Sequence, residues 1–278
     1  MAFTVNELIR PQMSWVSQIA DVKTIGAGDK AMFSVRMDGL RAFIQAKGST
    51  TARSKIAQKQ VLLETDNVSV RPVINVVELR QGRVQMADLI RDGALKMEYA
   101  MTAHIQNVLH AAASAWAAPF YGAGMGLVKT TLDPMIIHWL RTGGAAVLGD
   151  IAIINQLSAL TGFTAAVATR QFSDAIILEQ NRSGYIGVYN GASVMRIVNP
   201  YLEDNVTPLL SHKHLYILPT GADTSTRPLK VAFEGDVTSI EATNIDDLSF
   251  EVRLDRYFGA GIIMGVAPNI SVYEDQSI

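Results

Sequence analysis

The sequence predicts an α+β fold in which a mixed sheet and one long helix share a single chain. Residues 29–37 and 67–77 alternate apolar and polar side chains at the period of a half-buried strand. Residues 84–117 carry apolar side chains in steps of three and four, which is the period of one helix face. Between residues 175 and 218, short apolar segments are separated by Gly, Asn and Pro turns, as in a sheet region.

Composition excludes several classes of protein and bounds the rest. At 278 residues the chain can bury a substantial core, and it has no cysteine, which excludes disulfides and thiolate zinc sites. Hydrophobic residues make up 49% and charged residues only 18%, so we expect apolar surface reserved for other subunits. A pI near 6.2 argues against a protein whose whole surface binds nucleic acid. The apolar window 108–121 is too short to span a membrane, and residues 1–13 do not have the pattern of a secretory signal.

Two stretches of this nearly neutral chain carry opposite charge. Residues 36–60 hold six cations against the single acid Asp38, and residues 234–251 hold six acids and no cation. Such segregation predicts a surface that recognises another copy of the chain, while the alternative is two solvated faces that never meet. The candidate assembly residues are Arg36, Arg41, Lys47, Arg53, Lys55, Lys59, Glu234, Asp236, Glu241, Asp246, Asp247 and Glu251.

Residues 25–76 are predicted to form a long hairpin-like loop that projects from the body. Its two strands flank a polar, basic tip at residues 47–55, which has too few large apolar side chains to pack on a core of its own. A projecting loop exposes backbone edges and apolar side chains. We therefore expect a neighbouring molecule to cover it.

A long helix is predicted over 84–117, ended by Pro119 and a glycine-rich linker at 122–126. Its apolar face is formed by Met86, Ile90, Ala94, Met97, Met101, Ile105, Leu109, Ala112 and Trp116. Two shorter helices are expected at 134–141, beginning at Asp133 and Pro134, and at 151–160, capped by Asp150. The predicted strands of the second half are 175–178, 185–189, 193–198, 215–218 and 250–256.

No catalytic, cofactor or metal site is predicted. His212 and His214 have no nearby acid cluster to complete a metal site, and we interpret them as surface or turn residues. His104 and His110 lie six positions apart on the long helix, about 120° off a common face, so they cannot bind one ion together. The glycines at 122–126 follow a helix and lack the spacing of a dinucleotide-binding loop.

The order of these parts resembles that of tailed-bacteriophage major capsid proteins, whose shell fold is shared with encapsulins and the floor of herpesvirus capsids. The closing stretch 247–259 resembles the arginine-bearing return strand of such coat proteins, and residues 149–155 resemble a stretch of their axial domain. The resemblance implies an N-terminal arm at 1–24, an extended β-hairpin loop at 25–76, a peripheral domain at 77–129 and 236–278 with its spine helix at 84–117, and an axial domain with a mixed sheet at 130–235.

What the resemblance implies is a structural protein and not an enzyme. Its copies would associate with one another as hexamers and pentamers into an icosahedral shell around double-stranded DNA, which they would contact non-specifically. The loop of each copy would lie across its neighbour. Portal, scaffolding or decoration proteins are further expected partners, and the expected location is the virion, after assembly in the cytoplasm of the host bacterium. No cofactor and no membrane is implied.

Two other readings compete with the phage coat protein. The nearer one is an encapsulin-like compartment shell that holds a cargo enzyme. The other is a cytoplasmic α+β enzyme that uses His138 and nearby acids. Nucleic acid inside purified particles would favour the phage coat, and a bound cargo peptide would favour the compartment. A small oligomer with an acidic pocket around His138 would favour the enzyme.

Overall fold

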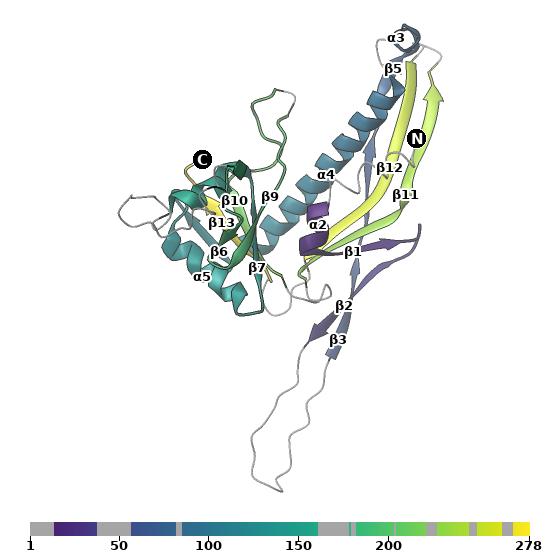
Figure 1. Ribbon diagram of the computed structural model, residues 1–278. Helices are drawn as coiled ribbons and strands as arrows, with labels where there is room; N and C mark the ends of the chain where they lie inside the picture. The colour runs from purple at the N-terminus through teal and green to yellow at the C-terminus, as the bar shows by residue number, and fades with distance from the viewer. Residues whose placement is uncertain are drawn as a thin grey trace, which may run out of the picture.

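The computed structural model consists of two lobes joined by one long helix, α4 (Figure 1). It describes residues 14–37, 57–81, 85–160, 178, 182–202, 204–220, 227–244, 249–262 and 269–278. The helices are α2 Ser14–Ile19, α3 Val76–Arg80, α4 Met86–Ser114, α5 Lys129–Leu140, α6 Ile151–Asn155 and the 3-10 helix η1 Gln156–Ala159. Among the residues described, no helix is both long and apolar enough to cross a membrane.

One lobe is built on a five-stranded sheet with the order β1-β11-β12-β4, in which β5 also pairs with β12. Its strands are β1 Ala20–Ile25, β4 Asp66–Val70, β5 Val73–Asn75, β11 Leu229–Thr243 and β12 Ser249–Ile262. β1 runs parallel to β11, and the other pairs are antiparallel. The two long strands β11 and β12 run beside α4 for most of its length (Figure 1).

The other lobe is built on a six-stranded sheet with the order β6-β13-β10-β7-β9-β8. Its strands are β6 Tyr121–Gly124, β7 Ala145–Gly149, β8 Val188–Tyr189, β9 Ala192–Arg196, β10 His214–Pro219 and β13 Ser271–Asp275. Parallel and antiparallel pairs both occur, so the prediction of a mixed sheet is confirmed. Both faces of its central strands are buried, which explains their continuous apolar runs.

The six-stranded sheet lies between α4 on one side and α5 with α6 on the other. Along β10, Tyr216 and Leu218 join the core cluster that contains the α4 face, while Leu215 and Ile217 join the cluster that contains α5 and α6. This alternation follows from the two-residue period of a strand. The short strand therefore belongs to two cores at once.

One face of α4 supplies the main core of the molecule. Its buried residues are Gly93, Ala94, Met97, Met101, Thr102, Ile105, Leu109, Ala112 and Ala113. The centre of the predicted apolar face is confirmed. The predicted end of this face is wrong, because the helix stops at Ser114. Trp116 lies beyond the helix and is 39% exposed. Glycine at position 93 lets β12 approach closely, since an added Cβ would lie 3.1 Å from Leu254 Cδ1.

The two shorter helices differ from their predicted bounds. α5 begins at Lys129 and not at Pro134, which lies inside it. The earlier start buries Leu132 completely, and Asp133 accepts a hydrogen bond from the Tyr189 hydroxyl at 2.8 Å in place of capping a helix. The predicted cap of the next helix is confirmed, because Asp150 Oδ1 accepts the amide of Ala152 at 2.8 Å.

The predicted linker at 122–126 is instead strand β6 and the turn after it. β6 pairs in parallel with β13, and the Gly126 amide donates to Asp275 Oδ1 at 2.8 Å. An added Cβ at Gly124 would lie 2.5 Å from the Tyr273 hydroxyl oxygen, so glycine is needed here for close packing. The glycines allow a strand to pass an aromatic ring and do not mark a flexible joint.

A separate two-stranded ribbon, β2 Ala31–Met37 and β3 Ala57–Leu63, extends away from both lobes (Figure 1). The predicted strand at 29–37 is thus confirmed. Its predicted partner at 67–77 is wrong: those residues form β4, β5 and the start of α3, and both strands pair with β12 in the body. The apolar alternation of 67–77 reflects packing on the main sheet, while the returning leg of the ribbon is β3.

We predict that Gly259→Ala destabilises the subunit by about 1–3 kcal/mol, the usual range for overpacking. A Cβ at this position would lie 2.4 Å from the backbone carbonyl oxygen of Glu64, which cannot move away without shifting the chain between β3 and β4. The measurement is urea unfolding of the unassembled subunit. Gly261→Ala is the control, because its Cβ would meet only the flexible end of Leu63. Equal losses in the two variants would contradict this account.

Candidate assembly interface

The ribbon formed by β2 and β3 is anchored on the body by a small core, which we call the hairpin root. It consists of Ala31, Phe33 and Ala232, with Ile25 and Leu63 packed around them. Phe33 on β2 is only 1% exposed, and Ala232 lies on β11. Burying one aromatic side chain here contributes roughly 1.5–3 kcal/mol. The hairpin root therefore attaches the ribbon firmly to the five-stranded sheet.

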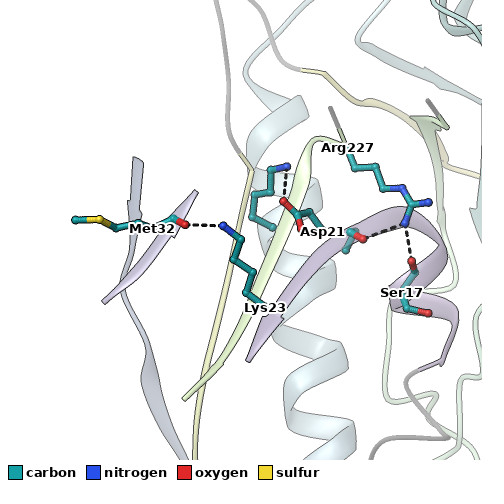
Figure 2. Close-up of polar contacts among 7 residues, drawn as sticks. Ser17, Asp21, Lys23, Met32 and Arg227 are labelled. Carbon is teal, nitrogen blue, oxygen red and sulfur yellow. Dashed lines mark hydrogen bonds and ion pairs between the residues drawn. The ribbon is translucent and has the colours of Figure 1, made fainter. Parts of the chain in front are cut away.

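Two lysines surround the ring of Phe33. The Lys23 ammonium lies 4.5 Å from the ring centroid and donates to the Met32 carbonyl oxygen at 2.7 Å. Lys230, only 2% exposed, lies 5.8 Å from the same centroid, and its Nζ is 3.1 Å from Asp21 Oδ2. Figure 2 shows Lys23 reaching from β1 to the backbone of β2. The buried cation and its partner carboxylate thus lie directly beneath the base of the ribbon.

Arg227 fixes the short helix α2 next to these strands. Its guanidinium donates to the carbonyl oxygens of Ser17 at 2.6 Å and Ala20 at 3.2 Å (Figure 2). Carbonyls in the last turn of a helix lack intrahelical donors, so this arginine satisfies groups that the helix itself leaves open. The start of β1 is held beside the start of β11 as a result.

Glu234 ties both ends of the ribbon to β11. Its carboxylate accepts the Thr65 hydroxyl at 2.6 Å, just after β3, and the Gly28 amide at 2.7 Å, just before β2. These two hydrogen bonds, the Thr65 bond first, lower the pKa of Glu234. The direction in which the ribbon leaves the body is therefore set by one side chain as well as by the hairpin root.

The outward face of the ribbon carries apolar side chains. Met32 and Leu62 are directly paired across β2 and β3, and they are 51% and 46% exposed. Cross-strand neighbours of this kind form one continuous patch. The ribbon thus buries Phe33 in its own body and presents Met32 and Leu62 to the outside.

The predicted charged residues are only partly within the described chain. Arg41, Lys47, Arg53, Lys55, Asp246 and Asp247 lie outside the described residues, and so do the side chains of Arg36 on β2 and Lys59 on β3. Among the acids that are described, Glu234 bonds within its own chain as above, and Glu251 forms an ion pair with Arg71. Asp236 and Glu241 are exposed on β11. The described part of the chain brings none of the predicted cations to these acids.

Sequence reasoning missed the residues that hold the hairpin root. The signal for one of them is readable: Lys230 is a single cation inside the apolar segment 229–233. Its partner Asp21 lies more than 200 positions away, and no local pattern connects the two. Among the described residues, no group of three or more histidines and acids is placed to hold a metal ion.

We predict that Asp21→Asn is more destabilising than Lys230→Met. The first change removes the negative charge beside a buried ammonium, which costs about 3 kcal/mol or more. The second removes the buried charge itself and leaves only Asp21, whose side chain is 18% exposed and can be solvated. Guanidinium unfolding of both variants measures the difference. An equal or smaller loss for Asp21→Asn would show that this ion pair does not stabilise the hairpin root.

The fold matches those of solved phage capsids at low sequence identity. The mature capsid of bacteriophage PhiM1 aligns with a TM-score of 0.61 and 8% identity over 94% of this chain and 86% of that one. A structure from Mycobacterium phage Che8 aligns with a TM-score of 0.59 and 14% identity over 88% of this chain and 84% of that one. A virus-like particle from Pyrococcus furiosus aligns with a TM-score of 0.53 and 11% identity over 98% of this chain and 97% of that one. Among curated proteins, none matches this chain.

The sequence itself matches one protein family along nearly its whole length. Residues 2–272 match the family described as "SPbeta prophage-derived putative capsid protein YonB". This assignment favours the phage coat over the encapsulin-like compartment and excludes the enzyme built on His138. The His138 ring packs against two aromatic rings, with its centroid 5.6 Å from that of Phe120 and 4.8 Å from that of Trp139. The chain therefore belongs to the YonB family of prophage-derived capsid proteins, has the tailed-phage major capsid fold, and is a structural component of a capsid shell.

Proposed function

We propose that this subunit assembles with copies of itself, as hexamers and pentamers, into an icosahedral shell around double-stranded DNA. The observation that carries the proposal is the β2–β3 ribbon, which extends from the body (Figure 1). Its cross-strand partners Met32 and Leu62 are both exposed. In the assembled shell the ribbon lies across an adjoining subunit. That subunit covers the two apolar side chains.

A two-stranded ribbon needs such cover for physical reasons. Two strands alone are marginally stable in water, and within the described residues β2 and β3 pair only with each other. Their outer edges thus carry unpaired backbone groups, which are templates for pairing with another chain. The hairpin root supports the base of the ribbon but leaves Met32 and Leu62 uncovered.

The proposed domain division follows the same plan. Residues 1–24 form the arm, 25–76 the extended loop, 77–129 with 236–278 the peripheral domain, and 130–235 the axial domain. Two features support it: α4 lies along the five-stranded sheet, and four of the six strands of the other sheet fall within 130–235. Strands β4 and β5, although within 25–76, pair with β12, so the projecting part of the loop is shorter than its sequence range. The boundaries also shift elsewhere, because β1 of the arm belongs to the five-stranded sheet, and β6 and β13 of the peripheral ranges belong to the six-stranded sheet.

Charge pairing sets the register between subunits in this proposal. The cations of 36–60 approach acids on a neighbour, of which Glu241 is exposed on β11. Glu234 and Glu251 contribute less, because they already bond within their own chain. Assembly takes place in the host bacterial cytoplasm, contacts to packaged DNA are non-specific, and portal, scaffolding or decoration proteins are further partners.

We predict that Met32→Gln with Leu62→Gln lowers the yield of assembled shells at least about tenfold while the subunit stays folded. Burying these side chains contributes roughly 1.5–3 kcal/mol each at every contact, and glutamine keeps their size without their apolar surface. Sedimentation measures assembly, and circular dichroism measures folding. The matched control is Met32→Leu with Leu62→Met, which should assemble normally. Normal shells from the glutamine variant would overturn the proposed contact.

We also predict that Arg53→Glu with Lys55→Glu impairs assembly without unfolding the subunit. Adding Glu241→Lys to this variant should restore part of the yield, because opposite charges would again face each other. Arg141→Glu, a reversal outside the basic stretch, serves as the control. Assembly of the double variant at the level of the unchanged protein would refute the charge-pairing proposal.

A further inference from the structure

Two histidines meet where α4 packs against the six-stranded sheet. His110 on α4 and His214 on β10 stack with their ring centroids 4.4 Å apart and their planes tilted by 43°. Both side chains are half-buried, and the buried Nδ1 atoms of both rings form no hydrogen bond with any residue that the structure describes. His214 is therefore part of an internal contact on β10, whereas the sequence predicts a surface or turn residue.

Neutral hydrogen bonds hold the same contact one helical turn away. The Gln106 side chain donates to the Ser211 carbonyl oxygen at 2.8 Å and accepts the Ser211 amide at 3.0 Å. Gln106 and His110 are four residues apart, so they lie on one face of α4. The amide pair does not titrate. The histidine pair is thus the part of this joint that can respond to pH.

The pair lies among a small set of ionisable groups. They are Glu274 on β13, Tyr121 on β6, Lys213 and Tyr216 beside His214 on the chain, and Asp150 before α6. Glu274 is the register partner of His214 and favours its charged form, but its carboxylate already accepts the Tyr121 hydroxyl. Lys213 opposes a charge on His214, and so does His110 once it is protonated.

We propose that the His110–His214 pair is an acid-sensitive latch between the two lobes of the subunit. With both rings neutral, they stack and close the contact between α4 and β10. Once a ring takes up a proton, the half-buried charge needs water, and two charged rings at this separation repel each other. The contact then opens, while the five-stranded sheet keeps its structure.

The direction of the His214 shift agrees with this role. Burial first, and the neighbouring His110 second, lower its pKa below the ordinary value of 6.5. A base whose pKa is lower in the folded state stabilises that state fully above the unfolded value and progressively less as the pH falls toward the folded value. The contact between α4 and β10 therefore begins to weaken below about pH 6.5, where carboxylates of ordinary pKa are still ionised.

Hydrogen exchange of the full-length subunit at pH 7.5 and 5.5, corrected for the intrinsic exchange rate, tests the latch. We expect protection in peptides covering 105–114 and 214–219 to fall about threefold to tenfold at the lower pH, because protonation weakens the local contact that protects them. Peptides covering 229–243 and 249–262 should keep their protection. An unchanged protection of 105–114 and 214–219 in the unaltered protein overturns the proposal without any variant.

Variants separate the latch from a general effect of acid. His214→Phe keeps an aromatic ring in the stack but removes one of the two rings that can be protonated, so the loss of protection between pH 7.5 and pH 5.5 should be clearly smaller than in the unaltered protein. His214→Gln gives a second neutral variant with the same expected result. His104→Gln, an exposed histidine on the same helix, should respond like the unaltered protein. An acid response of full size in both His214 variants would also overturn the proposal.

Discussion

The subunit depends on the packing of a single face of α4 against both sheets. Toward its start the helix lies on β12, where Gly93 admits Leu254, and toward its end it meets β10 through His110. One cluster of buried side chains runs through both contacts, from Met97 to Val272. A helix of 29 residues is stiff over this length, so the relation between the lobes is decided where its last turns meet the six-stranded sheet. That end of α4 is also where the neutral histidine pair lies.

The β2–β3 ribbon turns away from both cores (Figure 1). Its base is restrained three times, by the buried Phe33, by Lys23 and Lys230 around its ring, and by Glu234 at both of its ends. A ribbon so restrained has a defined direction before any partner arrives. Preorganisation of this kind lowers the entropy lost on association, which suits contacts that are repeated many times in one shell.

Sequence patterns predicted what local periodicity controls. The core of the α4 face, from Ala94 to Ala112, and the buried runs of the six-stranded sheet follow from side-chain period alone. Wrong assignments arose where tertiary contacts override a local signal. Pro134 resembles a helix start, yet α5 begins five residues earlier, at Lys129, and so buries Leu132. The glycines of β6 resemble a linker, although close packing against Tyr273 requires them.

The candidate interface was predictable only in outline, for the same reason. Alternation at 29–37 showed that a strand leads into a projecting loop, but not that the returning leg is β3. Charge segregation drew attention to Glu234, yet its partners Gly28 and Thr65 are distant in sequence, so its role inside the chain could not be predicted. Whether the remaining acids meet cations of a neighbour depends on a second molecule, which no single-chain pattern describes.

Electron cryomicroscopy of particles formed by the purified protein tests the central claim most directly. The account predicts closed shells in which Met32 and Leu62 of each ribbon lie in van der Waals contact with an adjoining subunit. Shells in which both side chains face solvent, or a ribbon folded back on its own body, would contradict it.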